Sequence, residues 1–266
     1  MIFQIGDRVI RLFLLWPSVA VLAMFIWVAN AAAEGAIDTD GPDFVESSET
    51  VPKGYFQYEV DLISVKTRRA PPETPGTSTP ALLKYGITDN VELRIAPEGY
   101  LLQNGKSGVG DIAFGLKWHA QDRDAITGKP AVSWILHFDT PTGSSQFRGR
   151  GNRPSLRSVI TWDLPSELAL GLMPGLRSDT REDGHRYVSA ILGAVLNKRV
   201  TDQFRVFIEM SAPQISRVRD GGVLANWDLG AAYLIANDTQ IGVRTGVAAN
   251  RNTPSNYMLF ELAQRF

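Results

Sequence analysis

Apolar and polar residues alternate along most of this chain, and this period of two constrains the fold more than any other feature of the sequence. Between residues 111 and 119 one parity is apolar throughout, and it consists of Ile112, Phe114, Leu116 and Trp118. Segments 131–138 and 204–210 repeat the pattern. Successive side chains of a β-strand point to opposite faces, whereas an amphipathic helix requires a period of 3.6 residues. The pattern therefore predicts an all-β protein.

The alternating segments divide into strands that are joined by connections of two kinds. About twelve strands are expected, beginning near Tyr55, Pro80, Asn90, Val109, Pro130, Pro154, Glu167, Arg186, Asp202, Gly222, Asp238 and Ser255. Connections after even-numbered strands are mostly short, as at 87–90 and 236–239, whereas those after odd-numbered strands are longer, as at 68–79 and 141–153. Short turns at one end and long loops at the other are typical of transmembrane barrels of the outer membrane.

Aromatic residues give an independent indication of a membrane barrel. Trp118, Trp134 and Trp162 lie on the apolar parity of their strands, near the ends that carry the short turns. An aromatic girdle at a membrane interface predicts this placement. A soluble β-sandwich, the alternative, would bury tryptophan without gathering it near the turns. Phe266, which ends the last strand at 257–266, is expected to join these tryptophans at the membrane interface.

The N-terminus has the pattern of a secretory signal peptide. Arg8 and Arg11 precede an apolar segment over residues 12–28. Ala31 and Ala33 follow in the small-residue positions of an A-x-A cleavage site. We expect export and cleavage after Ala33; cleavage after Ala31 and an uncleaved anchor helix are the alternatives.

Three segments are expected along the chain: a signal peptide at 1–33, a flexible periplasmic lead-in at 34–53 and a transmembrane β-barrel domain at 54–266. The lead-in is acidic, rich in small polar residues and almost without apolar periodicity. The chain contains no cysteine, which excludes disulfides, thiolate metal sites and a lipoprotein anchor. Without the signal peptide it carries slightly more acidic than basic residues, which argues against a nucleic-acid partner.

If the apolar parity faces lipid, the opposite parity points into the barrel. That parity carries charges of both signs, and the residues expected to line a pore are Arg94, Lys117, Arg205, Glu209, Asp228 and Arg244. Barrels of eight strands are filled by side chains and those of sixteen hold an open channel, so twelve strands predict a narrow, charge-lined pore. A salt-bridged interior that conducts nothing is the alternative, because buried charges must be paired in any such barrel.

We expect no catalytic, metal or cofactor site. His119 and His137 fall on the polar parity and His185 lies in a predicted outer loop, so a serine–histidine pair at the lipid face is not indicated. No two histidines are close in the sequence, and their spacing indicates no metal site. A basic cluster over Arg148–Arg157 is expected at an outer loop, either solvated or in contact with lipopolysaccharide phosphates. The solvated loop is the preferred interpretation.

Several short motifs resemble an outer-membrane β-barrel transporter family, that of the MetA-pathway of phenol degradation. In chain order, the matching segments are Thr79–Arg94, Gly108–Asp111, Pro141–Gly143, Asp228–Tyr233, Asn237–Gln240 and Arg265–Phe266. One departure is Gly242, where family members more often carry an aspartate. The resemblance extends from about Gly54 to the C-terminus, and it implies an outer-membrane barrel with a transport role for aromatic or hydrophobic compounds.

The sequence thus predicts an antiparallel up-and-down β-barrel of about twelve strands in the outer membrane of a Gram-negative bacterium. A passive channel or transporter for small molecules is the expected function. A non-conducting structural barrel and a lipid-acting enzyme are the alternatives. The expected partners are outer-membrane lipid, a small-molecule solute and the barrel assembly machinery, which would recognise the C-terminal strand.

Overall fold

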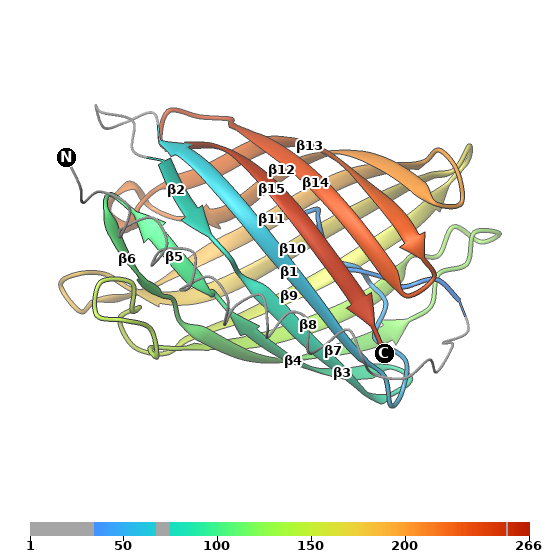
Figure 1. The fold of residues 1–266 in the computed structure, drawn as a ribbon, viewed down its shortest axis with the longest axis horizontal. Helices are drawn as coiled ribbons and strands as arrows, with labels where there is room; N and C mark the ends of the chain where they lie inside the picture. The colour runs from blue at the N-terminus through green and yellow to red at the C-terminus, as the bar shows by residue number, and fades with distance from the viewer. Residues whose placement is uncertain (1–34, 68–74, 254) are drawn as a thin grey trace, which may run out of the picture.

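A closed antiparallel β-barrel forms the body of the protein (Figure 1). The computed structural model describes residues 35–67, 75–253 and 255–266, and the expected signal peptide lies outside these residues. Barrel strands that are consecutive in the sequence are hydrogen-bonded neighbours. The last strand, β15 (Ser255–Arg265), pairs with the first, β1 (Phe56–Thr67), over their full lengths. This pairing closes the barrel, so neither β1 nor β15 is left as a sheet edge.

Three barrel strands each consist of two segments: β2 (Pro75–Ser78) with β3 (Ala81–Thr88), β4 (Val91–Pro97) with β5 (Tyr100–Gln103), and β6 (Lys106–Val109) with β7 (Ile112–Gln121). The hydrogen-bonded ladders show that the two segments of each strand follow one another along the barrel wall. Strand β1 pairs with β3 in its first half and with β2 in its second half. The β4–β7 and β5–β6 ladders likewise share one register.

The remaining strands are uninterrupted: β8 (Ala131–Thr140), β9 (Arg153–Leu164), β10 (Leu168–Thr180), β11 (Arg186–Arg199), β12 (Phe204–Ile215), β13 (Val223–Ala236) and β14 (Thr239–Ala248). The described residues therefore contain 15 strand segments that make twelve barrel strands. This confirms the predicted fold. A single turn of 3-10 helix, η1 (Val218–Asp220), lies between β12 and β13. In the described part of the chain, no helix is long and apolar enough to cross a membrane.

The apolar parity of the strands points outward. Phe114, Trp118 and Leu136 leave 49%, 51% and 52% of their surface exposed. A continuous apolar surface of this kind is unfavourable in water. It is, however, the surface that a transmembrane barrel presents to the hydrocarbon of a bilayer. The period-two pattern of the sequence thus separates a lipid-facing outer surface from a polar interior.

Short turns and the C-terminus lie at the same end of the barrel (Figure 1), which in outer-membrane barrels is the periplasmic end. Trp118 and Trp134 are directly opposite one another on β7 and β8 near this end. At the C-terminus, Phe266 exchanges two backbone hydrogen bonds with Phe56, of 2.8 and 3.1 Å, and the two rings are stacked. Contact of these aromatics and of Trp162 with the membrane interface stays a prediction.

Candidate functional site in the barrel interior

The polar parity of the strands forms a charged barrel interior. All six residues predicted to line a pore belong to the inward face. Arg94, Lys117, Glu209 and Asp228 are almost completely buried, and Arg205 and Arg244 are partly exposed. Ionic side chains can be buried only when partners satisfy them. The partners of this interior come in large part from outside the barrel strands.

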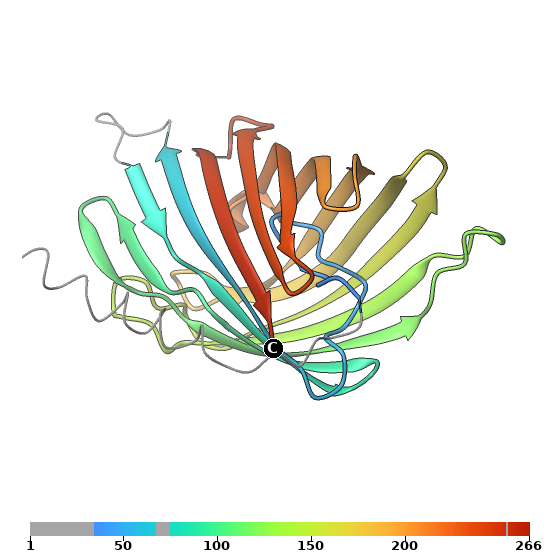
Figure 2. The ribbon, with the colours of Figure 1, turned by 45° about the vertical axis from the view of Figure 1, so that its right-hand side comes forward.

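Residues 35–53, which we call the N-terminal plug, occupy the interior of the barrel at its short-turn end (Figure 2). Near its start, the Ile37 amide donates a 2.6 Å hydrogen bond to the Asn237 carbonyl in the β13–β14 turn. Its chain turns inside the barrel and returns to the same end, where the Gly54 amide bonds the Gly86 carbonyl at 2.9 Å. The sequence predicts a flexible lead-in here, and the structure differs because the barrel wall supplies partners for its polar groups.

Asp40 of the plug is bound by three cations of the barrel wall. Its carboxylate lies 3.0 Å from Lys84 Nζ, 2.7 Å from Arg94 Nη2 and 2.8 Å from Lys117 Nζ. Burial by itself would raise the pKa of Asp40. The positive charges of Lys117, Lys84 and Arg94 outweigh burial and hold this pKa well below its usual value. Asp40 is therefore an ionised centre that ties strands β3, β4 and β7 to the plug.

Glu46 makes a second ionic contact between the plug and the same wall. Its carboxylate lies 2.5 Å from Arg94 Nη1 and also pairs with Arg157 of β9. Burial opposes ionisation, but Arg157 and Arg94 lower the pKa of Glu46 to about 2. The guanidinium of Arg94 thus binds Asp40 through one terminal nitrogen and Glu46 through the other.

Carboxylates of the barrel wall bind the backbone of the plug. Glu209 accepts hydrogen bonds from the amides of Phe44 at 2.8 Å and Val45 at 2.7 Å. Glu92 accepts one from the Val51 amide at 2.8 Å. An unpaired buried amide is destabilising, so these carboxylates allow an irregular segment to lie inside the barrel.

Glycines allow the plug to approach the wall closely. A Cβ atom on Gly193 would lie 2.6 Å from Val45 Cγ2, and one on Gly242 would lie 2.6 Å from Pro42 Cγ. Both distances are shorter than side chains adopt. The glycine that departs from the family pattern at position 242 therefore provides the space that the plug occupies.

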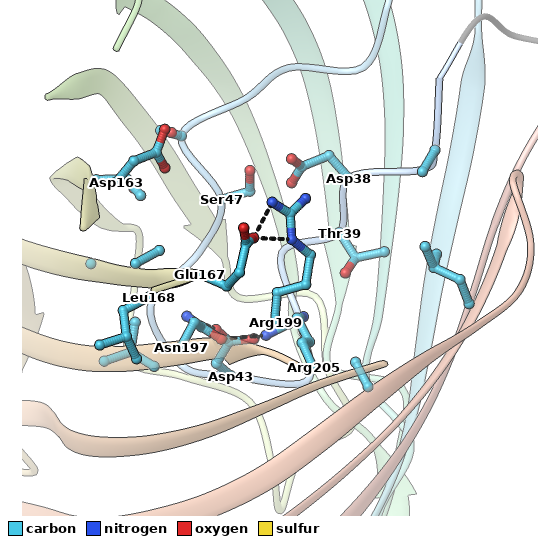
Figure 3. A pocket seen from close by; sticks show the side chains of 18 of the residues that line it. Asp38, Thr39, Asp43, Ser47, Asp163, Glu167, Leu168, Asn197, Arg199 and Arg205 are labelled. Carbon is cyan, nitrogen blue, oxygen red and sulfur yellow. Dashed lines mark hydrogen bonds and ion pairs between the residues drawn. The ribbon is translucent and has the colours of Figure 1, made fainter. Parts of the chain in front are cut away.

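A cavity of about 670 Å³ remains between the plug and the wall of β9 to β13 (Figure 3). Arg205 lies on its border and binds Asp43 of the plug at 2.9 Å and Asn197 at 2.8 Å. Near the short turns, Arg199 and Glu167 form an ion pair beside the cavity. The cavity extends from these turns to Glu46, so the plug leaves space along this wall.

Four of the six predicted pore residues form two groups. Arg94 and Lys117 meet at Asp40, whereas Glu209 and Arg244 pair at 3.3 Å on the other side of the interior. Asp228 belongs to neither group: its carboxylate accepts hydrogen bonds from Ser211 and Tyr257, at 2.5 and 2.6 Å. These residues face the interior, and their lining of a conducting pore stays a prediction.

Sequence reasoning missed the plug acids Asp40, Asp43 and Glu46. Lys84 and Arg157, which bind these acids, lie on the polar parity of their strands. The alternation of the sequence therefore places both of them inside the barrel. For the acids, the only signal was an excess of carboxylates next to a barrel with inward cations.

The predicted Arg148–Arg157 cluster does not form one outer-loop group. Arg153 begins β9 and lies 3.0 Å from the buried Asp111, and Arg157 is inside the barrel at Glu46. Arg150 lies in the loop before β9, and its side chain donates a 3.1 Å hydrogen bond to the Glu182 carbonyl in the β10–β11 loop. The basic residues of this stretch therefore separate into wall and loop positions, because every second residue of β9 faces inward.

A closed barrel with an apolar outer surface and a charged, partly filled interior defines an outer-membrane β-barrel protein. A family model described as "Putative MetA-pathway of phenol degradation" matches residues 39–266, and the chain belongs to this family. This confirms the resemblance drawn from the sequence motifs. The matched region includes most of the plug, so the plug lies within the family domain.

Solved structures share the fold. An outer membrane channel from Pseudomonas putida F1 matches with a TM-score of 0.63 and 14% identity, over 85% of this chain and 99% of that chain. The NanC porin matches with a TM-score of 0.54 and 9% identity, over 77% and 98% of the two chains. The KdgM porin matches with a TM-score of 0.53 and 10% identity, over 78% of this chain and 99% of that chain. At these identities the likeness shows the fold alone. No curated protein matches the sequence.

Proposed function

We propose that the protein is an outer-membrane channel for small molecules and that the N-terminal plug sets the width of its pathway. The observation that carries this proposal is the charged interior that leads from the short-turn end into the barrel beside the plug. A cavity of about 670 Å³ has the size of a small-molecule site. Lining residues of both signs, such as Arg205 and Glu167, give this pathway a polar surface.

The comparisons support a channel and suggest a class of solute. The structure from Pseudomonas putida F1 is described as an outer membrane channel, and NanC and KdgM are described as porins. The family description refers to phenol degradation, so aromatic compounds are the first solutes to test. A charged interior favours aromatic compounds that carry a charged group over neutral hydrophobic ones. No catalytic role is part of the proposal.

Planar lipid bilayers test the proposal directly. Wild-type protein is expected to give small conductance steps, because the plug occupies much of the interior. The Asp40→Asn variant is expected to give larger steps, since it weakens three contacts with the wall. If both proteins fail to conduct at every voltage, the barrel is structural. Lipid hydrolysis that disappears in His137→Ala would instead identify an enzyme.

A further inference from the structure

Around Asp40 and Glu46, the barrel wall has more positive than negative charge of its own. Four of its cations contact Asp40 or Glu46: Lys84, Arg94, Lys117 and Arg157. Two wall carboxylates pair with these cations, Glu59 at 2.5 Å from Lys84 and Glu92 at 3.6 Å from Arg94. Asp40 and Glu46 supply the other two negative charges. Displacement of the plug would therefore leave this wall with two uncompensated positive charges.

These cations are placed around two carboxylate positions. The first position, occupied by Asp40, is surrounded by two lysines and Arg94 at 2.7–3.0 Å. The second, occupied by Glu46, lies between Arg94 and Arg157. Lys84, Arg94 and Lys117 are at most 2% exposed, so their geometry is fixed by packing. Fixed cations in a dry environment bind carboxylates strongly.

We propose that Asp40 and Glu46 act as an internal ligand in an anion site of the barrel wall, and that a small molecule with two carboxylates binds there in competition with the plug. This inference rests on the proposed channel function for its role in transport. A dicarboxylate would replace both plug acids and restore the charge balance of the wall. The cavity beside the plug borders Glu46 and gives such a molecule a route to the second position.

Binding is measured by calorimetry on the full-length protein in detergent, and this readout does not depend on conduction. In the Asp40→Asn/Glu46→Gln variant the site has lost its internal ligand, so we expect saturable binding of succinate. Butyrate, with one carboxylate, is expected to bind at least about tenfold more weakly, and butanediol not at all. Wild-type protein is expected to bind succinate at least about tenfold more weakly than the double variant, because the plug must first be displaced.

Two control variants locate the site. Glu49→Gln removes a plug carboxylate that pairs with Arg123 near the β7–β8 turn, and this variant should bind succinate no better than the wild type. Arg94→Gln, added to the double variant, should abolish binding because Arg94 touches both carboxylate positions. Mobility on unboiled gels shows whether each barrel is folded.

Equal binding of succinate and butanediol, or succinate binding that survives Arg94→Gln, would overturn the proposed site. If the double variant does not fold, Glu46→Gln alone exposes the second position, and its succinate binding must then depend on Arg157. Loss of conductance with retained succinate binding would contradict the channel and leave the anion site standing. Conductance without succinate binding would contradict the anion site and leave the channel standing.

Discussion

Arg94 Nη2 lies 2.7 Å from Asp40 Oδ2, although the two residues are 54 positions apart in the chain. A residue predicted to line a narrow pore thus holds the segment that fills part of the interior. The contact is buried and charge-assisted, which makes it stronger than an exposed ion pair. Under the proposed function, the width of the pathway depends on how firmly the wall retains this aspartate.

Gly242→Asp is predicted to displace the plug by steric conflict. Any Cβ at this position would lie 2.6–2.9 Å from the ring of Pro42, and the aspartate would also bring a charge to a closely packed contact. We expect severalfold larger single-channel conductance with normal heat-modifiability of the barrel. Adding Pro42→Gly, which removes the opposing ring, should bring the conductance back toward wild type. A double variant that conducts like Gly242→Asp would show that the clash is not the cause.

The contact that Glu46 makes with Arg94 and Arg157 is predicted to persist in mild acid. Arg157 and Arg94 outweigh burial and lower the pKa of Glu46 to about 2, from a usual value of 4.5. A lowered pKa means that this carboxylate stabilises the plugged state fully above about pH 4.5, and that the contribution is lost as the pH falls toward 2. We therefore expect the ratio of wild-type to Glu46→Gln conductance to be constant from pH 7 to about pH 5 and to rise below that. A change of this ratio centred near pH 6 would contradict the prediction.

The barrel could be predicted from the sequence because its determinants are local. Each strand separates lipid from the interior by alternation of neighbouring residues, so Phe114 and Lys117 show their directions without knowledge of the partner strand. Connection lengths then order the strands around the barrel. The start of β3 at Ala81 lies next to the strand start predicted at Pro80, whereas β2 at Pro75–Ser78 falls inside the predicted connection 68–79, so that part of the prediction was wrong.

The position of the plug could not be predicted in the same way, because its determinants are distant in the sequence. Asp40 and Lys117 are separated by 77 residues, and Phe44 and Glu209 by 165. Within its own neighbourhood the segment is acidic and nearly without apolar periodicity, which is typical of a solvated lead-in. Only the closed barrel brings buried cations to its carboxylates and buried carboxylates to its amides.

Lys117→Met is predicted to destabilise the plugged barrel. Lys117 is completely buried, and its ammonium group lies 2.8 Å from Asp40, so the variant leaves this carboxylate with two of its three cations. Loss of a hydrogen bond to a charged group costs about 2 kcal/mol. The measurement is the urea concentration at which the heat-modifiable band disappears. Lys106→Met, at an exposed position of β6, is the matched control and should leave this midpoint unchanged.

Deletion of Phe266 is predicted to lower assembly in the outer membrane without blocking export across the inner membrane. Phe266 closes the β15–β1 seam through two backbone hydrogen bonds with Phe56, and its ring contacts those of Phe56 and Tyr58. We propose that the same residue is recognised by the barrel assembly machinery. Outer-membrane fractions should contain severalfold less of the deletion variant, with processed protein accumulating in the periplasm. Phe266→Tyr, which retains the ring, should assemble normally, and wild-type outer-membrane levels of the deletion variant would contradict the prediction.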